Sequence, residues 1–295
     1  MIRERSAGDV VFNVANTVFL AITSIVTIYP LYYVFIYSLN NAQDSVLGGL
    51  YLYVRSFTFQ NYTALFRSSE VVNAYAITAA RTVIGMIANT FLSALFAYGM
   101  QKKRLIGRKL YHAIAIIPMF FSGGLIPTYL LIRGLGLTNS FLVYVVPTLV
   151  GIWYMIVTKA YLNTIPASIE ESARMDGANE LVIFVRIIVP MAVPILACVA
   201  LWNAIAHWNA WFDAYIYTSR DSLQTIQLLI RKMIRREAGT AFNQPMMVEM
   251  LKLRQVTPRS MQAAATVVTI APILVVYPFI QRYFIKGIVL GAVKE

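Results

Sequence analysis

The stretch 168-SIEESARMDGANELVIFVRIIVP-190 is a short charged segment between two long apolar runs. Ser168-x-x-Glu171 fits a capping box, in which the serine and glutamate side chains satisfy free backbone N–H groups at the start of a helix. Gly177 lies where a helix commonly ends in the left-handed conformation. The pattern therefore predicts a short helix over 169–176 with carboxylates at its N-terminal end, where the helix dipole favours them.

A second helix is expected directly after the glycine, because Asn179 is a good N-cap residue and the chain turns apolar towards Pro190. A helix, a glycine hinge and a second helix form a compact knob that could press into a groove of another protein. An ordinary solvated connector with good caps would have the same spacing. Spacing alone leaves both interpretations open.

The rest of the chain is strongly apolar. Of 295 residues, 59% are hydrophobic and 13% are charged, whereas soluble domains carry about 25% charged residues. A bilayer core about 30 Å thick needs about 20 apolar helical residues, and six stretches without Asp, Glu, Lys or Arg meet that length. We therefore predict an all-α integral membrane protein with one membrane domain over 1–295. The expected spans are 12–38, 72–100, 110–132, 139–162, 189–216 and 259–284, and the charged loop is 166–190.

Basic residues gather in the short segments on one side of these spans, above all in 102-KKRLIGRK-109. The segment 217–258 breaks this pattern, but long loops carry little weight in the positive-inside rule. We therefore expect the N- and C-termini in the cytoplasm. Within the third span, Gly123 and Gly124 permit a break in the helix.

The residues of the charged loop also carry a family resemblance. Glu171-Ser172-Ala173 is followed after three residues by Gly177, and after nine more by Ile187-x-Val189-Pro190. This order resembles the "EAA" loop of ABC-importer permeases (E-A-A, three residues, G, nine residues, I-x-L-P), with a serine for the first alanine and a valine for the leucine. With Asp176-Gly177-Ala178 and Pro194, it resembles the carbohydrate-uptake, maltose-permease-like branch.

The resemblance implies a type I ABC-importer permease of the MetI-like fold in the bacterial cytoplasmic membrane. In this family the short helix docks into a cytoplasmic ATPase, and closure of two ATPases on ATP switches the cavity from inward-facing to outward-facing. The chain lacks a Gly-x4-Gly-Lys-Ser/Thr phosphate loop, so we expect a non-catalytic subunit without its own cofactor. The implied partners are a second permease subunit, two ATPases that hold ATP and Mg, and an extracytoplasmic solute-binding protein. We favour a different sister subunit over a second copy of this chain. The residues expected at the ATPase contact are Glu170, Glu171, Ser172, Ala173, Asp176, Gly177 and Ala178.

The end of the fifth expected span, 202-WNAIAHWNAWFDAYIY-217, combines aromatic rings with amide and carboxylate groups. On a continuous helix, Asn203, His207 and Trp211 would share one face, because they lie at i, i+4 and i+8. Such a face suits sugar rings, but Trp and Tyr also collect at the bilayer interface, so a sugar contact and an aromatic belt remain alternatives. The HWNAWFDA string resembles permeases for complex oligosaccharides. The candidate substrate-pathway residues are Asn203, His207, Trp208, Trp211 and Asp213.

A cluster of basic residues lies in 228-LLIRKMIRRE-237. Its like charges at i, i+4 repel by about 0.2–0.5 kcal/mol per pair unless an anion relieves them. Acidic lipid headgroups, an acidic patch on the binding protein, or an anionic oligosaccharide could supply that anion, and we favour the binding protein. The candidate contacts are Arg231, Lys232, Arg235 and Arg236.

The function we expect is the import of oligosaccharides, including uronate-containing ones such as alginate or pectin fragments. An ABC permease for another solute is the first alternative. An ion-coupled carrier is the second, but such carriers place ionisable residues at mid-membrane, and Arg81 and Asp213 lie near span ends. A membrane enzyme is disfavoured, because one cysteine and two histidines form no metal or acid–base grouping.

Overall fold

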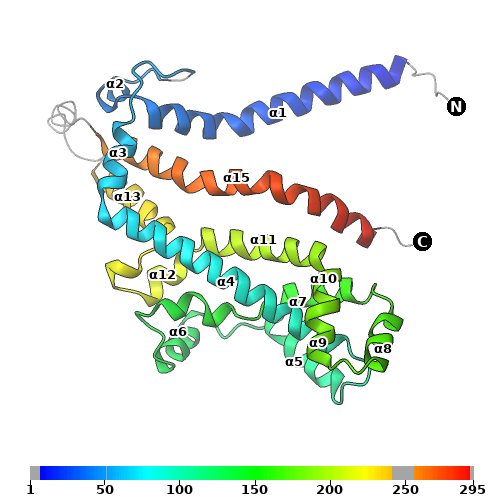
Figure 1. Cartoon of the computed structure of the whole chain (residues 1–295). Coiled ribbons are helices and arrows are strands. Elements are labelled where there is room, and N and C mark those ends of the chain that lie inside the picture. Colours follow the sequence, from blue (N-terminus) through cyan, green and yellow to red (C-terminus); the bar gives the residue numbers. More distant parts are fainter. Residues whose placement is uncertain (1–6, 51, 241–255, 293–295) are drawn as a thin grey trace. The chain divides into compact units, whose positions relative to one another are not determined.

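Figure 1 shows a computed structural model of the chain, which describes residues 7–50, 52–240 and 256–292. For residues 7, 236–240, 277 and 279–292 it describes the backbone alone. Every regular element in the described ranges is helical, and the β contact there is an isolated bridge between Asn40 and Phe57. The predicted all-α class is confirmed.

The chain divides into two compact units. The first comprises residues 1–68 with 232–270, and the second comprises 69–231 with 271–295. Two helices, α13 and α15, have residues in both units. The helices of the first unit and these two are α1 (Ala7–Leu39), α2 (Ala42–Val46), α3 (Gln60–Arg67), α13 (Ile226–Thr240) and α15 (Pro258–Ala292).

In the first unit, the buried side chain of Asn40 organises the turn after α1. Its Oδ1 accepts hydrogen bonds from the backbone N–H groups of Arg55 and Ser56, at 3.0 and 2.8 Å. Its Nδ2 donates to Asp44 Oδ2 and Ser45 Oγ, at 2.7 and 2.8 Å. Both polar atoms of this buried amide thus have partners, as buried polar groups require.

The second unit is built around α4 (Ser69–Gln101), which packs against α7 (Ile152–Leu162) and α11 (Val193–Asn209) (Figure 1). Shorter helical pieces complete this unit and connect these three helices. They are α5 (Arg108–Phe120), α6 (Leu125–Gly134), η1 (Phe141–Tyr144), η2 (Val146–Thr148), α8 (Ala167–Met175), α9 (Glu180–Ile183), the π-helical η3 (Phe184–Ile188), α10 (Val189–Met191), α12 (Phe212–Tyr217) and η4 (Asp221–Leu223).

Three helices within the described residues are long and apolar enough to cross a membrane, and six spans result if each bent pair counts as one. The break in the third span occurs at the predicted glycines, where Gly124 has φ 84°. The continuous spans are Gly8–Leu39, Ser69–Gln101 and Pro258–Val276; the bent pairs are Arg108–Phe120 with Leu125–Gly134 (119°), Phe141–Thr148 with Ile152–Leu162 (45°) and Glu180–Met191 with Val193–Asn209 (84°).

The prediction of one continuous helix over 189–216 was wrong. The helix α11 ends at Asn209, because Ala210 is extended with φ −71° and ψ 131°, and α12 begins two residues later. A contact from α4 accounts for the break: Arg81 Nη1 donates to the Ala210 carbonyl oxygen at 3.4 Å. That carbonyl is therefore satisfied without a continuing helix.

The same arginine forms an ion pair across the break. Arg81 is buried, its Nη1 lies 3.1 Å from Asp213 Oδ1, and its Nη2 donates to the second carboxylate oxygen. The guanidinium also lies over the Tyr144 ring, 4.4 Å from the centroid. A buried charge needs such a partner, because removal of the partner leaves it without compensation.

We expect Asp213→Asn to destabilise the protein by about 3 kcal/mol, the low end of the range for a broken buried pair, because the Asp213 side chain is 24% exposed. The measurement is thermal unfolding of the detergent-purified transporter. The double variant Arg81→Met/Asp213→Leu should recover much of the loss. Unfolding of Asp213→Asn at the wild-type temperature would contradict this account.

The packing of α11 on α4 depends on a glycine. A Cβ atom at Gly85 would lie 2.4 Å from Nε2 of the buried His207, whereas a Cβ at Gly99 on the same helix would meet nothing within 4 Å. We expect Gly85→Ala to cost about 1–3 kcal/mol by overpacking. The matched control Gly99→Ala should be neutral or stabilise by about 0.5–1 kcal/mol. Equal unfolding temperatures of the two variants would show that the His207 ring moves aside without cost.

Candidate functional site

The charged loop begins with α8, and the predicted cap at Ser168 was wrong. The helix starts at Ala167, and its N-cap residue is Pro166, which makes no side-chain cap hydrogen bond. Proline suits a helix start, because its ring holds φ near the helical value and its missing N–H would have no helical partner there. Ser168 therefore lies inside the first turn instead of in front of it.

The predicted end of this helix is confirmed. Gly177 has φ +83°, and its N–H donates to the Arg174 carbonyl at 3.0 Å, while the Ala178 N–H donates to the Ala173 carbonyl at 3.0 Å. This pair of bonds is a Schellman motif. The predicted cap at Asn179 is also confirmed, since its Oδ1 accepts a hydrogen bond from the Val182 N–H at 2.9 Å.

One face of α8 points away from the rest of the second unit. Glu171, Ser172 and Asp176 are exposed, and Glu171 has no ion-pair partner within the described part of the chain. Met175 is 88% exposed, and it lies one helical turn after Glu171. Met175 is not among the contact residues predicted from the sequence, although its i+4 spacing from Glu171 was a usable signal. This outward face combines carboxylates with an apolar side chain.

Other residues expected at the ATPase contact face inward. Ala173 is buried in a cluster that includes Ala97, Tyr98 and Phe184, so its small side chain allows α8 to approach this chain's own core. Glu170 is 13% exposed and contacts Lys102 and Arg174. The two neighbouring glutamates therefore have different surroundings: Glu171 is solvent-facing and Glu170 is engaged within the chain.

Glu170 shares the cation of Arg174 with a second carboxylate, that of Glu180. Arg174 Nη2 lies 3.2 Å from Glu170 Oε2 and 2.8 Å from Glu180 Oε1. Burial alone would lower the pKa of the Arg174 guanidinium, but the hydrogen bond to Glu180 and the charges of both glutamates raise it. Arg174 therefore stays charged and bridges the two carboxylates.

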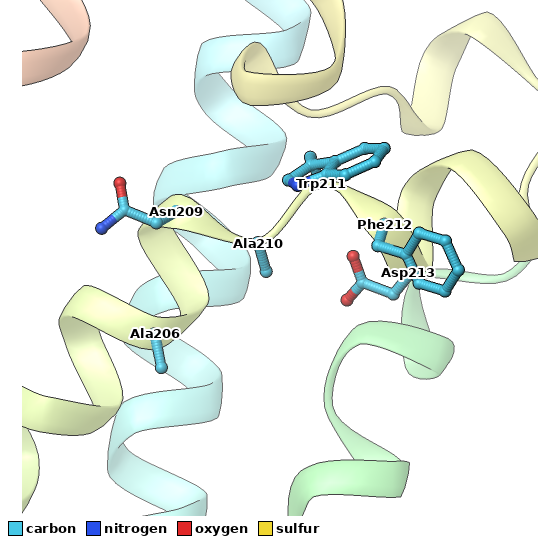
Figure 2. A pocket seen from close by; sticks show the side chains of 6 residues that line it. All are labelled: Ala206, Asn209, Ala210, Trp211, Phe212 and Asp213. Carbon is cyan, nitrogen blue, oxygen red and sulfur yellow. The ribbon is translucent and has the colours of Figure 1, made fainter. Parts of the chain in front are cut away.

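An open pocket of about 410 Å³ lies at the break after α11. Figure 2 shows the chain leaving α11 at Asn209, passing through Ala210 and reaching Trp211, with Asn209 and Asp213 on opposite sides of Ala210 in this view. The pocket's lining residues are Ala206, Asn209, Ala210, Trp211, Phe212 and Asp213.

The structure separates the candidate substrate-pathway residues into two groups. Trp211 and Asp213 line the pocket, whereas Asn203, His207 and Trp208 are buried inside the packing. Their internal partners include the Val199 carbonyl, which accepts from Asn203 Nδ2 at 3.0 Å, and the Tyr75 ring, 5.5 Å from that of Trp208. The predicted face joining Asn203, His207 and Trp211 was wrong, because the helix ends before Trp211.

The basic cluster lies on α13. The guanidinium of Arg231 stacks over the Trp211 ring, 3.9 Å from its centroid, and Arg231 is exposed. Lys232 is partly buried and Arg235 is exposed. The side chain of Arg236 lies outside the described residues. Arg231 is thus the member of the cluster that stacks on a residue of the pocket.

The chain is similar to known proteins over most of its length. Residues 82–289 match the family described as "Binding-protein-dependent transport system inner membrane component". The chain is 33% identical over 276 residues to the polygalacturonan/rhamnogalacturonan transport system permease protein YtcP of Bacillus subtilis (strain 168), covering 94% of this chain and 96% of that protein. It is 31% identical to protein LplC of the same organism over 284 residues, covering 96% and 95%.

A solved structure has the same architecture. A chain of a bacterial ABC transporter involved in the import of the acidic polysaccharide alginate superposes with a TM-score of 0.87 at 29% identity, covering 95% of this chain and 98% of that chain. The predicted MetI-like permease fold is confirmed. The chain belongs to the family of binding-protein-dependent transport system inner membrane components, the integral membrane permease subunits of ABC importers.

Proposed function

We propose that this chain is one of two permease subunits of an ATP-driven importer that carries uronate-containing oligosaccharides across the bacterial cytoplasmic membrane by alternating access. The observation that carries the proposal is the near full-length similarity to a permease named for polygalacturonan and rhamnogalacturonan. The fold shared with a transporter for an acidic polysaccharide supports the same class of substrate.

The pocket at the α11–α12 break supports an anionic sugar by its chemistry. Trp211 lines the pocket, and the exposed guanidinium of Arg231, beside the pocket, lies against one face of the Trp211 ring. Sugar C–H surfaces stack on aromatic rings, and a guanidinium forms paired, charge-assisted hydrogen bonds with a carboxylate. The carboxylate of Asp213 does not repel an anion in the pocket, because Arg81 neutralises its charge.

The partners follow from the same proposal. The importer comprises this subunit, a different sister permease and two cytoplasmic ATPases, which hold ATP and Mg. An extracytoplasmic binding protein delivers the sugar, as suggested by a neighbour of the same fold whose structure contains an alginate pentasaccharide-bound periplasmic protein. The N- and C-termini lie in the cytoplasm, together with α8.

The outward face of α8 suits the ATPase contact. Met175 can enter an apolar pocket, while Glu171 and Asp176 on either side of it can pair with basic residues. Interfaces commonly combine such a buried apolar anchor with a charged rim. Glu170 takes no direct part, because it is engaged by Lys102 and Arg174.

We expect Glu171→Lys to reduce coupled uptake at least about tenfold, because truncation or reversal of a buried interfacial charge costs about 2–5 kcal/mol. The measurement is co-purification of the ATPase subunits and uptake by proteoliposomes that contain the complete transporter. The control is Glu70→Lys, the same change at an exposed carboxylate at the start of α4. Wild-type uptake by Glu171→Lys would exclude α8 as the ATPase contact.

The substrate class can be tested with two oligosaccharides of equal length. We expect Arg231→Gln to reduce uptake of an oligogalacturonate about tenfold or more, because a hydrogen bond to a charged group contributes about 1.5–3 kcal/mol. Uptake of a neutral arabino-oligosaccharide, if any, should be unaffected. The matched control is Arg220→Gln, an exposed arginine of the preceding loop. Equal losses for both sugars would assign Arg231 a structural role, and no loss would remove it from the sugar pathway.

A further inference from the structure

We propose that five residues form an ion latch that fixes α8 to the cytoplasmic end of α4, so that a force applied to α8 by the ATPase is transmitted along α4. The inference rests on the proposed function, because it concerns how that importer is coupled to ATP hydrolysis. The ion latch consists of Tyr98 and Lys102 at the end of α4, and Glu170, Arg174 and Glu180 in the charged loop.

The ion latch joins parts of the chain that are distant in sequence. Lys102 directly follows the last residue of α4, and its Nζ contacts Glu170 Oε2 and lies 3.3 Å from Glu180 Oε2. The hydroxyl of Tyr98 donates to Glu180 Oε2 at 2.7 Å, and its ring lies 3.7 Å below the Lys102 ammonium group. Tyr98 in α4 and Lys102 directly after it therefore contact α8 at Glu170 and the start of α9 at Glu180.

The charges of the ion latch are balanced within this chain. Lys102 and Arg174 carry two positive charges, Glu170 and Glu180 carry two negative ones, and each cation contacts both carboxylates. A cluster already neutral in this way has little need of a charged partner protein. This balance distinguishes it from Glu171, which has no such partner in the described structure.

Apolar packing reinforces the ionic contacts. The same core contains Ala97 and Tyr98 of α4, Ala173 of α8 and Phe184 of η3. An isolated exposed ion pair contributes little to stability, but a network combined with a buried core restricts the orientation of α8 to one geometry. We therefore expect α8 to move together with the end of α4.

Nearer its middle, α4 holds the break that lines the pocket. Lys102 lies 21 positions after Arg81, which corresponds to about 30 Å along a helix at 1.5 Å per residue. At that distance Arg81 holds the Ala210 carbonyl and Asp213 at the α11–α12 break. A displacement of the ion latch along α4 can therefore change the geometry of the pocket, as a rigid element with two attachments transmits motion.

The principal test removes the lysine and keeps its neighbour as a control. We expect Lys102→Met to lower oligogalacturonate uptake per ATP hydrolysed about tenfold in proteoliposomes of the complete transporter with its binding protein. Coupling between sites typically corresponds to about 5- to 150-fold effects. ATPase subunits should still co-purify. The control is Lys103→Met, the same charge change at an exposed neighbour. Wild-type uptake per ATP by Lys102→Met would overturn the proposal.

A covalent replacement separates coupling from stability. Lys102→Cys/Glu170→Cys should be uncoupled, and a short, reversible bifunctional thiol reagent that bridges the two cysteines should restore uptake per ATP to within about twofold of wild type. Wild-type protein, whose Cys198 is buried, serves as the reagent control. If the cross-link restores assembly or thermal stability but not uptake per ATP, the ion latch has only a structural role. If Lys102→Met fails to assemble, the cross-linked double variant still tests the proposal.

Failure of the proposed function would look different. Wild-type transporter that neither associates with the ATPase subunits nor hydrolyses ATP with them would contradict the importer proposal itself. If the wild type hydrolyses ATP but imports no oligogalacturonate, the substrate proposal fails. The ion latch is then tested by the stimulation of ATP hydrolysis that the binding protein causes. Lys102→Met should then lose that stimulation about tenfold, and unchanged stimulation would overturn the latch.

Discussion

The buried guanidinium of Arg81 is the constraint on which the part of the second unit around the α11–α12 break depends. An arginine removed from water needs an opposite charge and acceptors for its N–H groups. Asp213 and the Ala210 carbonyl supply the charge and accept from the two terminal nitrogens, Nη1 and Nη2, only because α11 ends at Asn209 and the chain turns before α12. The Nε atom has no hydrogen-bond partner among the described residues. The requirements of one side chain on α4 thus account for the break that forms the pocket.

The helix α4 connects the two places where function is expected. Near its middle it holds the α11–α12 break, and just beyond its end Lys102 holds the charged loop. Between them it packs closely on α11, with Gly85 leaving room for the ring of His207. Close packing of this kind transmits displacement, because a packed interior has few voids into which side chains can yield.

The acidic residues of the charged loop have two kinds of surroundings. Glu170 and Glu180 face inward and are neutralised by Lys102 and Arg174, whereas Glu171 faces outward beside Met175. In the proposed importer, a segment that binds a moving ATPase and passes on its motion needs both kinds of contact. If α8 had the outward face but no inward contacts, it would move without α4. If it had the inward contacts but no outward face, it would offer no surface to a partner.

The sequence by itself determined the all-α class, the membrane spans in outline, the Gly177 turn and the Asn179 cap, because hydropathy and backbone conformation depend on neighbouring residues. It also carried the family resemblance through the spacing of the charged loop. Only the tertiary structure decided that Glu170 and Glu171 have opposite surroundings and that the fifth span breaks at Ala210. Those outcomes depend on Lys102 and Arg81, which lie far away in the chain, and the energy of a buried charge is set by the partners that folding brings to it.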